Sequence, residues 1–364
     1  MKIKQATTLA HPNIALAKYW GKRDYGHNLP AVPSLSVTLA GMTTATTVTF
    51  DPALEKDTLV LGGQEAPATA TARVTGLLDR IRKRAGMTEK ARVVSANDFP
   101  TAAGLASSAS AFAALALAAS SAAGLQLPNE EISNLARLTS VSAARSVFGG
   151  FVELRAGWPK DEKLSAQQIA PPEHWPIRIV VAVVTEGPKA VSSTDGMLHT
   201  VRTSPYYAAW VERAPGMFGR IKRAILDKDI EALGIAAEES ALAMHASSIA
   251  ATPGLLYWTG TTLEVLAEVR RLRAVGLGAY ATIDAGPHVK VICSAEDEIE
   301  VAKQIASVPG VLRTIVTRPG PGARVFTAAD ERANTESMTF ESISTAYVTY
   351  DIDSGDIETE SVKR

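Results

Sequence analysis

Two adjacent serines, Ser107 and Ser108, follow a loop of small residues and begin a long apolar run that is rich in alanine. Alanine and leucine favour helices, and Gly124 ends the run, so we expect a buried helix over residues 109–123. The start of a helix carries unpaired N–H groups and a partial positive charge, and Gly104 allows close approach of a ligand. The segment therefore suits phosphate oxygens or a metal ion. A core helix with a serine cap explains the same pattern equally well.

Cations that can hold anionic groups occur at two further places. Lys18 and Lys22 are four residues apart with Tyr19 between them, and four apolar residues precede Lys18. This pattern predicts that the stem of Lys18 is enclosed. Arg145 lies in a serine-containing segment, and its planar guanidinium suits a carboxylate or a phosphate. The alternative is that these cations lie on the surface, where ion pairs contribute very little.

A carboxylate also lies where catalysis is common. Asp284 directly follows an apolar segment, residues 276–283, and precedes Gly286 and Pro287. The pattern predicts an acidic residue between the end of a strand and a turn. It fits a catalytic carboxylate and, as the alternative, a plain Asx-turn.

The composition limits the classes of function. The chain has 364 residues, with 37 Lys and Arg against 38 Asp and Glu and a net charge of −1. This balance gives no indication of nucleic acid or an anionic membrane as a partner. The single cysteine, Cys293, excludes an intrachain disulfide and fits a reducing, cytoplasmic location. No secretory signal is apparent, and residues 109–123 are too few for a membrane span.

The positions of apolar residues predict alternating strands and helices. We expect two domains, residues 1–186 and 187–330, and a polar, partly disordered tail over residues 331–364 with a late strand near residues 347–352. Residues 186–197 have the composition of a polar loop. Strands are predicted over residues 7–10, 34–39, 44–50, 58–61, 92–95, 177–184 and 276–283. Helices are predicted over residues 72–85, 129–138, 226–242, 263–274 and 296–306.

In order along the chain, four segments resemble the mevalonate diphosphate decarboxylases, a branch of the GHMP kinase superfamily. They are residues 15–23 (ALAKYWGKR), 99–110 (FPTAAGLASSAS), 140–150 (SVSAARSVFGG) and 283–287 (IDAGP). Smaller similarities occur at residues 192–197 and 244–246, and the match extends over most of residues 7–326. The resemblance implies a two-domain α+β GHMP kinase fold, with an N-terminal α+β domain and a ferredoxin-like α+β C-terminal domain. The active site would lie in the cleft between them.

The resemblance also implies a reaction. ATP, with Mg²⁺, would phosphorylate the 3-hydroxyl of (R)-5-diphosphomevalonate. Phosphate and carbon dioxide would then leave, which gives isopentenyl diphosphate in the mevalonate pathway of isoprenoid biosynthesis. The protein would be a cytoplasmic homodimer.

Individual roles follow from the same resemblance. Asp284 would face the 3-hydroxyl as general base or orienting group, and Lys18 would lie beside it. Arg145, helped by Ser140, would clamp the substrate carboxylate. His11, His245 and His288 are expected to be structural. The substrate phosphates would bind to Tyr19, Lys22, Ser142 and Ser193. The ATP phosphates would be wrapped by Ala103, Gly104, Leu105, Ala106, Ser107 and Ser108, with Ser107 reaching the magnesium ion.

The chain departs from the family pattern at four positions. Glycines are usual where Thr139 and Val141 stand, a cysteine where Ala144 stands, and an asparagine where Val32 stands. Bulk at residues 139 and 141 would reshape the substrate pocket, so the number of substrate phosphates stays open. The alternatives are a 5-phosphomevalonate decarboxylase, a 3-kinase that does not decarboxylate, and a non-catalytic ATP-binding module.

Overall fold

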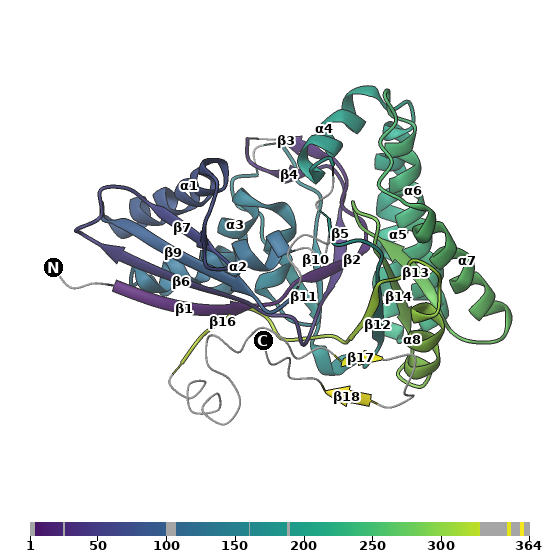
Figure 1. The fold of residues 1–364 in the computed structure, drawn as a ribbon. Coiled ribbons are helices and arrows are strands. Elements are labelled where there is room, and N and C mark those ends of the chain that lie inside the picture. Colours follow the sequence, from purple (N-terminus) through teal and green to yellow (C-terminus); the bar gives the residue numbers. More distant parts are fainter. Residues whose placement is uncertain are drawn as a thin grey trace.

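The computed structural model describes residues 4–24, 26–99, 107–159, 161–187 and 190–327, together with the backbone of two short strands at 348–350 and 357–359. Figure 1 shows two α+β halves side by side, the N-terminal half in purple and blue and the C-terminal half in green. The expected two-domain α+β fold is therefore confirmed.

The first sheet of the N-terminal half has six strands in the order β16-β1-β6-β9-β7-β8. All neighbours are antiparallel except β7 and β9. Helix α2 packs against β1 and β6, and α1 and α3 flank it. The elements are β1 (Lys4–Ala10), β6 (Thr44–Asp51), β7 (Thr58–Leu61), β8 (Gln64–Glu65), β9 (Lys90–Asn97), β16 (Arg324–Val325), α1 (Ala68–Ala85), α2 (Ser107–Ala122) and α3 (Asn129–Thr139).

A second, four-stranded sheet joins this half to the rest of the molecule. Its order is β11-β10-β5-β2, all antiparallel. A short hairpin and two 3₁₀-helices flank it. The elements are β2 (Asn13–Ala17), β3 (Lys22–Asp24), β4 (Leu29–Pro30), β5 (Ser34–Thr38), η1 (Val141–Val147), β10 (Phe151–Leu154), β11 (Gln167–Ala170) and η2 (Pro172–His174).

The C-terminal half is built on an antiparallel sheet in the order β13-β14-β12-β15. With helices between β12 and β13 and between β14 and β15, this is the expected ferredoxin-like arrangement. Strands β17 (Val348–Tyr350) and β18 (Ile357–Thr359) pair separately. The other elements are β12 (Arg178–Val183), α4 (Ser193–Thr203), α5 (Tyr207–Asp227), α6 (Ile230–Ile249), α7 (Gly260–Ala274), β13 (Tyr280–Ile283), β14 (Val289–Cys293), α8 (Glu298–Ala306) and β15 (Arg313–Thr317).

The two halves share a hydrophobic core. Strand β12 is buried on both faces, which explains its unbroken apolar sequence. Val180 packs towards α7 and α8, whereas Val181 packs with Ile221 and Leu233 of α5 and α6 and with Val37 of β5. This strand precedes the domain boundary expected at residue 186, yet it pairs with β14 and β15 of the C-terminal half.

Most expected elements are present, with three corrections. The strand expected over 276–283 begins only at Tyr280, as β13. The expected loop over 186–197 contains the start of α4, because the side chain of Ser192 accepts a hydrogen bond from the Asp195 N–H at 3.1 Å and caps the helix. The expected helix over 226–242 is interrupted. Lys228 adopts a left-handed conformation with φ 57°, and Asp229 then caps α6. A late strand is present as β17.

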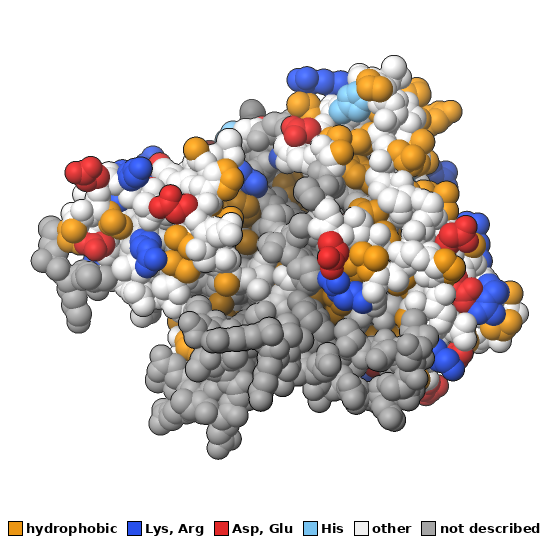
Figure 2. All heavy atoms as spheres, in the orientation of Figure 1, with side chains coloured by type: hydrophobic (Ala, Val, Ile, Leu, Met, Phe, Trp, Pro, Cys, Tyr) orange, Lys and Arg blue, Asp and Glu red, His pale blue; other side chains and the backbone are white. Residues whose placement is uncertain are grey.

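The surface agrees with the near-neutral composition. On the face in Figure 2, acidic and basic side chains are interspersed over both halves and are not gathered by sign. Within the described ranges, no helix is both long enough and apolar enough to cross a bilayer.

Candidate active site

A cavity of about 390 Å³ lies between the two halves. Its wall includes residues from β2, α1, the start of α2 and η1, and from α4, α6 and the turn after β13. Among the described lining residues are four cations, Lys18, Lys22, Arg73 and Arg145, and one carboxylate, Asp284, a formal charge of +3. The cavity is therefore suited to ligands that carry several negative charges.

The carboxylate of Asp284 lies between two lysines. Lys18 Nζ is 2.7 Å from Asp284 Oδ1, and Lys290 Nζ is 3.2 Å from Oδ2. Both lysine side chains are 1% exposed, whereas the Asp284 side chain is 25% exposed. Burial opposes ionisation of Asp284, but the two ammonium groups outweigh it and hold its pKa well below the usual range. Burial lowers the pKa of Lys18 to about 8, although the attraction of Asp284 opposes this shift.

The C-terminal half fixes the segment that carries Lys18. The Lys18 N–H donates to Ser240 Oγ of α6 at 3.0 Å, and Trp210 Nε1 of α5 donates to the Trp20 carbonyl at 2.9 Å. Gly21 has a φ of +96°, and a Cβ there would lie 2.0 Å from the Tyr207 hydroxyl oxygen. Only glycine fits this close, left-handed turn without a shift. Lys18 therefore reaches Asp284 because helices of the second half hold its backbone.

Arg145 is buried without a carboxylate partner. Its Nε donates to Ser36 Oγ at 2.9 Å and its Nη1 to Ser34 Oγ at 2.6 Å, since alternate residues of β5 point to one face. Its Nη2 lies 3.4 Å from Asn13 Oδ1. The residue is 2% exposed, and burial lowers its pKa to about 10. Within the described ranges no ion pair involves Arg145, so its charge is available for an anionic ligand.

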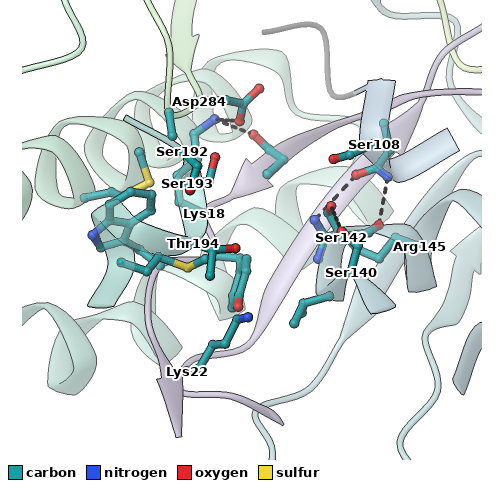
Figure 3. Close-up of a pocket in the computed structure, with 18 of the residues that line it drawn as sticks. Lys18, Lys22, Ser108, Ser140, Ser142, Arg145, Ser192, Ser193, Thr194 and Asp284 are labelled. Atoms are coloured by element: carbon teal, nitrogen blue, oxygen red, sulfur yellow. Dashed lines mark hydrogen bonds and ion pairs between the residues drawn. The ribbon is translucent and has the colours of Figure 1, made fainter. Parts of the chain in front are cut away.

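Two helix starts line the same cavity. Ser107 and Ser108 begin α2, as expected, and Ser193 and Thr194 begin α4. Helix N-termini favour anions through their N–H groups and dipole. Figure 3 shows Lys18 and Asp284 on one side of the cavity, with Ser108, Ser140, Ser142 and Arg145 on the other.

A second cavity, of about 470 Å³, adjoins the first and shares Ser107, Ser108 and Arg73 with it. Arg73, on α1, lies over the ring of Phe112, with its Cζ 4.7 Å from the ring centroid, and donates to the Thr139 carbonyl at 3.3 Å. The wall is mainly apolar and includes Leu59, Val74, Val93 and Leu115. An apolar chamber that opens onto a cationic one is a suitable shape for an aromatic base attached to phosphates.

The cavity brings together the described residues that the sequence analysis selected. All of Lys18, Tyr19, Lys22, Ser107, Ser108, Ser140, Ser142, Arg145, Ser193 and Asp284 line it. Ala103, Gly104, Leu105 and Ala106 lie outside the described residues. Of the four departures from the family pattern, Thr139 and Val141 line the cavity, whereas Val32 and Ala144 are fully buried in the packing.

Sequence reasoning missed several residues of the site. Lys290 could have been found from the sequence, since it is the one charged residue in the apolar segment VKVIC, the buried strand β14. Thr194 lay within the family similarity at residues 192–197 but was given no role, and Asn13 and Arg73 resemble ordinary polar residues of a strand and a helix. His245, which the sequence analysis expects to be structural, is buried: its ring centroid lies 4.8 Å from that of Trp258, and burial lowers its pKa to about 4.

The fold and the site together define a two-domain protein of the GHMP kinase type, with an anion-binding cavity between its domains. Residues 10–166 match the family model of the diphosphomevalonate decarboxylase-like N-terminal domain, and residues 179–350 match that of the mevalonate 5-diphosphate decarboxylase C-terminal domain. The chain belongs to the diphosphomevalonate decarboxylase family.

Two curated relatives illustrate the similarity. The diphosphomevalonate decarboxylase of Candida albicans is 37% identical over 350 residues, which cover 87% of this chain and 96% of that protein. The phosphomevalonate decarboxylase of Haloferax volcanii is 33% identical over 303 residues, which cover 83% of this chain and 92% of that protein.

Solved structures agree with these relatives. The mevalonate diphosphate decarboxylase of Staphylococcus aureus has a TM-score of 0.85 and 35% identity, and the match covers 90% of this chain and 99% of that one. A complex of MDDEF with MVAPP, AMPPCP and magnesium has a TM-score of 0.83 and 39% identity, and the match covers 90% of this chain and all of that one.

Proposed function

We propose that this protein catalyses the ATP-dependent decarboxylation of (R)-5-diphosphomevalonate to isopentenyl diphosphate, ADP, phosphate and carbon dioxide. The observation that carries the proposal is the pair of Lys18 and Asp284 in one cavity with Arg145 and the start of α2. The similarity to diphosphomevalonate decarboxylases over most of the chain supports it.

The substrate fits the charges of the cavity. Its carboxylate would bind to Arg145, which already has neutral partners on three nitrogens, with Ser140 nearby. Its diphosphate would bind to side chains from both halves, Tyr19, Lys22, Ser142 and Ser193, and to Arg73. In this arrangement the 3-hydroxyl, between the two anionic ends, would lie close to Asp284.

ATP would occupy both cavities. The base would lie in the apolar cavity, and the phosphates would pass over Ala103, Gly104, Leu105, Ala106, Ser107 and Ser108 towards Asp284. In the described part of the chain no cluster of His, Cys, Asp and Glu can hold a metal ion. Mg²⁺ keeps few protein ligands and is commonly bound through substrate phosphates, and here the Ser107 hydroxyl would contribute one ligand. Bound there, the ion would neutralise charge on the phosphates.

The phosphorylation step would use Asp284 and Lys18. With its pKa far below the usual range, Asp284 is a weak base, so it would orient the 3-hydroxyl and accept the proton only as the new P–O bond forms. The Lys18 ammonium would stabilise negative charge on the transferred phosphoryl group. The products of this step are ADP and the 3-phosphorylated substrate.

The elimination step would then proceed without a further reactant. The C3–O bond breaks and phosphate leaves with its electron pair, which builds positive charge at C3. The C1–C2 bond breaks, its electrons form the C2–C3 double bond, and C1 leaves as carbon dioxide. Arg145 would hold the carboxylate in line until it departs, and the cations of the cavity would stabilise the departing phosphate.

One assay tests the proposal against its alternatives. The purified protein receives ATP and Mg²⁺ with mevalonate, 5-phosphomevalonate or 5-diphosphomevalonate, and both ADP and carbon dioxide are counted. We expect equal amounts of both products, with the highest kcat/KM for 5-diphosphomevalonate. ADP without carbon dioxide would select a 3-kinase, and neither product with any of the three would favour a non-catalytic module.

The monophosphate is the second candidate substrate. Thr139 and Val141 line the cavity where the family usually has glycine, and a relative at 33% identity is a phosphomevalonate decarboxylase. Extra bulk at these positions would favour a shorter phosphate chain. A higher kcat/KM for 5-phosphomevalonate in the same assay would select this function.

The cytoplasmic location, the homodimer and the domain boundaries are also proposals. Cys293 is fully buried and burial raises its pKa to about 12, which fits a thiol kept reduced in the cytoplasm. Light scattering tests for the homodimer. Limited proteolysis tests the domains 1–186 and 187–330 and the tail 331–364.

A further inference from the structure

Asn28 lies behind the cavity wall and contacts one of its cations. Lys22 Nζ donates to Asn28 Oδ1 at 2.6 Å, and Asn28 Nδ2 donates to the Leu138 carbonyl at 2.7 Å. Lys22 lines the cavity, whereas Asn28 is not among the residues of its wall. Asn28 therefore connects a cavity cation to the end of α3 without facing the ligand space itself.

The conformation of Asn28 is itself unusual. Its φ is 50°, in the left-handed region that few residues other than glycine and asparagine adopt readily. It ends the turn of the β3–β4 hairpin, the same hairpin that carries Lys22. This conformation directs the amide towards Lys22 and Leu138 at once.

A fully buried arginine holds the backbone at this turn. Arg137 of α3 donates through Nη1 to the carbonyls of His27 and of Asn28, the latter at 3.3 Å. Its Nε donates to the Leu164 carbonyl at 2.8 Å, and its Nη2 to Asn134 Oδ1 at 2.7 Å. These acceptors are all neutral, and no ion pair involves Arg137 in the described ranges. A buried cation needs its hydrogen bonds, because an unsatisfied buried charge is costly. The bonds from Arg137 therefore fix the backbone of the turn.

We propose that Asn28 is a positioning residue for phosphate binding: it holds the Lys22 ammonium at the cavity wall through a neutral oxygen, and Arg137 and the Leu138 carbonyl hold Asn28. This inference rests on the proposed function, in which Lys22 binds the substrate phosphates. A neutral acceptor directs the ammonium without cancelling its charge, whereas a carboxylate in the same place would compete with the phosphates for it.

The position offers a matched pair of substitutions. Asn28→Gly and Asn28→Asp both lose the hydrogen bond to the Leu138 carbonyl, because neither can donate it. Glycine accepts the φ of 50° without strain, and aspartate has nearly the shape of asparagine. Only aspartate keeps an acceptor for Lys22, and it adds a negative charge. Asn28→Asp therefore keeps the contact with Lys22 and adds a negative charge, whereas Asn28→Gly removes the contact and adds no charge.

The experiment measures kcat, the KM for 5-diphosphomevalonate and the KM for ATP, with thermal unfolding as a check on folding. We expect the substrate KM to rise about threefold to tenfold in Asn28→Gly and about thirtyfold or more in Asn28→Asp. kcat and the KM for ATP should change less than about threefold. A purely structural role predicts instead that the rise in substrate KM follows the loss of thermal stability in each variant, and that kcat and the KM for ATP change with it.

The outcomes separate this inference from the proposed function. Equal substrate KM values in the wild type and Asn28→Asp, or a larger increase in Asn28→Gly than in Asn28→Asp, would overturn the role of Asn28 and leave the decarboxylase proposal intact. If the wild type releases no carbon dioxide, the decarboxylase proposal fails. Calorimetry then measures the affinity for 5-diphosphomevalonate. The role of Asn28 requires the tightest binding in the wild type, weaker binding in Asn28→Gly and the weakest in Asn28→Asp.

Discussion

Lys18 Nζ and Asp284 Oδ1 lie 2.7 Å apart although 266 residues separate them in the chain. Lys18 follows β2 of the N-terminal half, and Asp284 follows β13 of the C-terminal half. The pair therefore exists only when the two halves are packed together. Because the Lys18 backbone is bonded to α6, the geometry of this pair is set by the interface and not by either half alone.

The pH dependence of turnover should report the protonation of Lys18. Burial lowers its pKa to about 8, so the ammonium form predominates below pH 8 and is lost as the pH rises through that value. Loss of the charge removes the attraction to Asp284 and to the transferred phosphoryl group. We expect kcat/KM to fall on an alkaline limb with an apparent pKa near 8. A profile that stays level beyond pH 9.5 would show that Lys18 has no such role.

Lys290 should set the pH at which kcat/KM falls on the alkaline side. Its positive charge lowers the pKa of Lys18, so Lys290→Met should move the alkaline limb of kcat/KM to higher pH. Lys290→Arg keeps a charge beside Asp284 and serves as the control, with the limb expected to stay near 8. An unchanged or lowered limb in Lys290→Met would contradict this coupling.

Arg145→Gln should weaken the binding of the substrate, above all in the transition state. Removal of a buried, hydrogen-bonded charge that meets a ligand charge costs about 2–5 kcal/mol. We therefore expect kcat/KM for the phosphorylated mevalonate to fall by about thirtyfold or more, with the KM for ATP little changed. Arg155→Gln is the control, because Arg155 is half exposed and pairs with Asp161 away from the cavity. Similar kinetics in the two variants would remove Arg145 from the site.

Much of the candidate site could be predicted from residues that are close together in the sequence. The alanine-rich run predicted α2 with both serines in its first turn, and the apolar residues before Lys18 predicted its burial. Asp284 was singled out because it lies at a strand end followed by turn residues, and the family resemblance gave it a catalytic role. These features follow from residues adjacent in the chain, so a single sequence is enough to predict them.

Other features depend on contacts that no local pattern reveals. Arg73 lies in an amphipathic helix among other cations, and its place at both cavities follows from the packing of α1 against α2. Asn28 gains its contact with Leu138 only when the hairpin meets α3. The start of α4 was missed because the serine cap lies within a polar stretch that also fits a loop. Such positions follow from tertiary packing.

The substitution Asp284→Asn tests the central claim most directly, because asparagine keeps the shape of the side chain and removes its charge. ATP binding by calorimetry should stay within about threefold of the native protein, since the ATP phosphates would bind at the start of α2. Release of carbon dioxide from 5-diphosphomevalonate should fall by about a hundredfold to ten-thousandfold. Carbon dioxide release near the native rate would contradict the account.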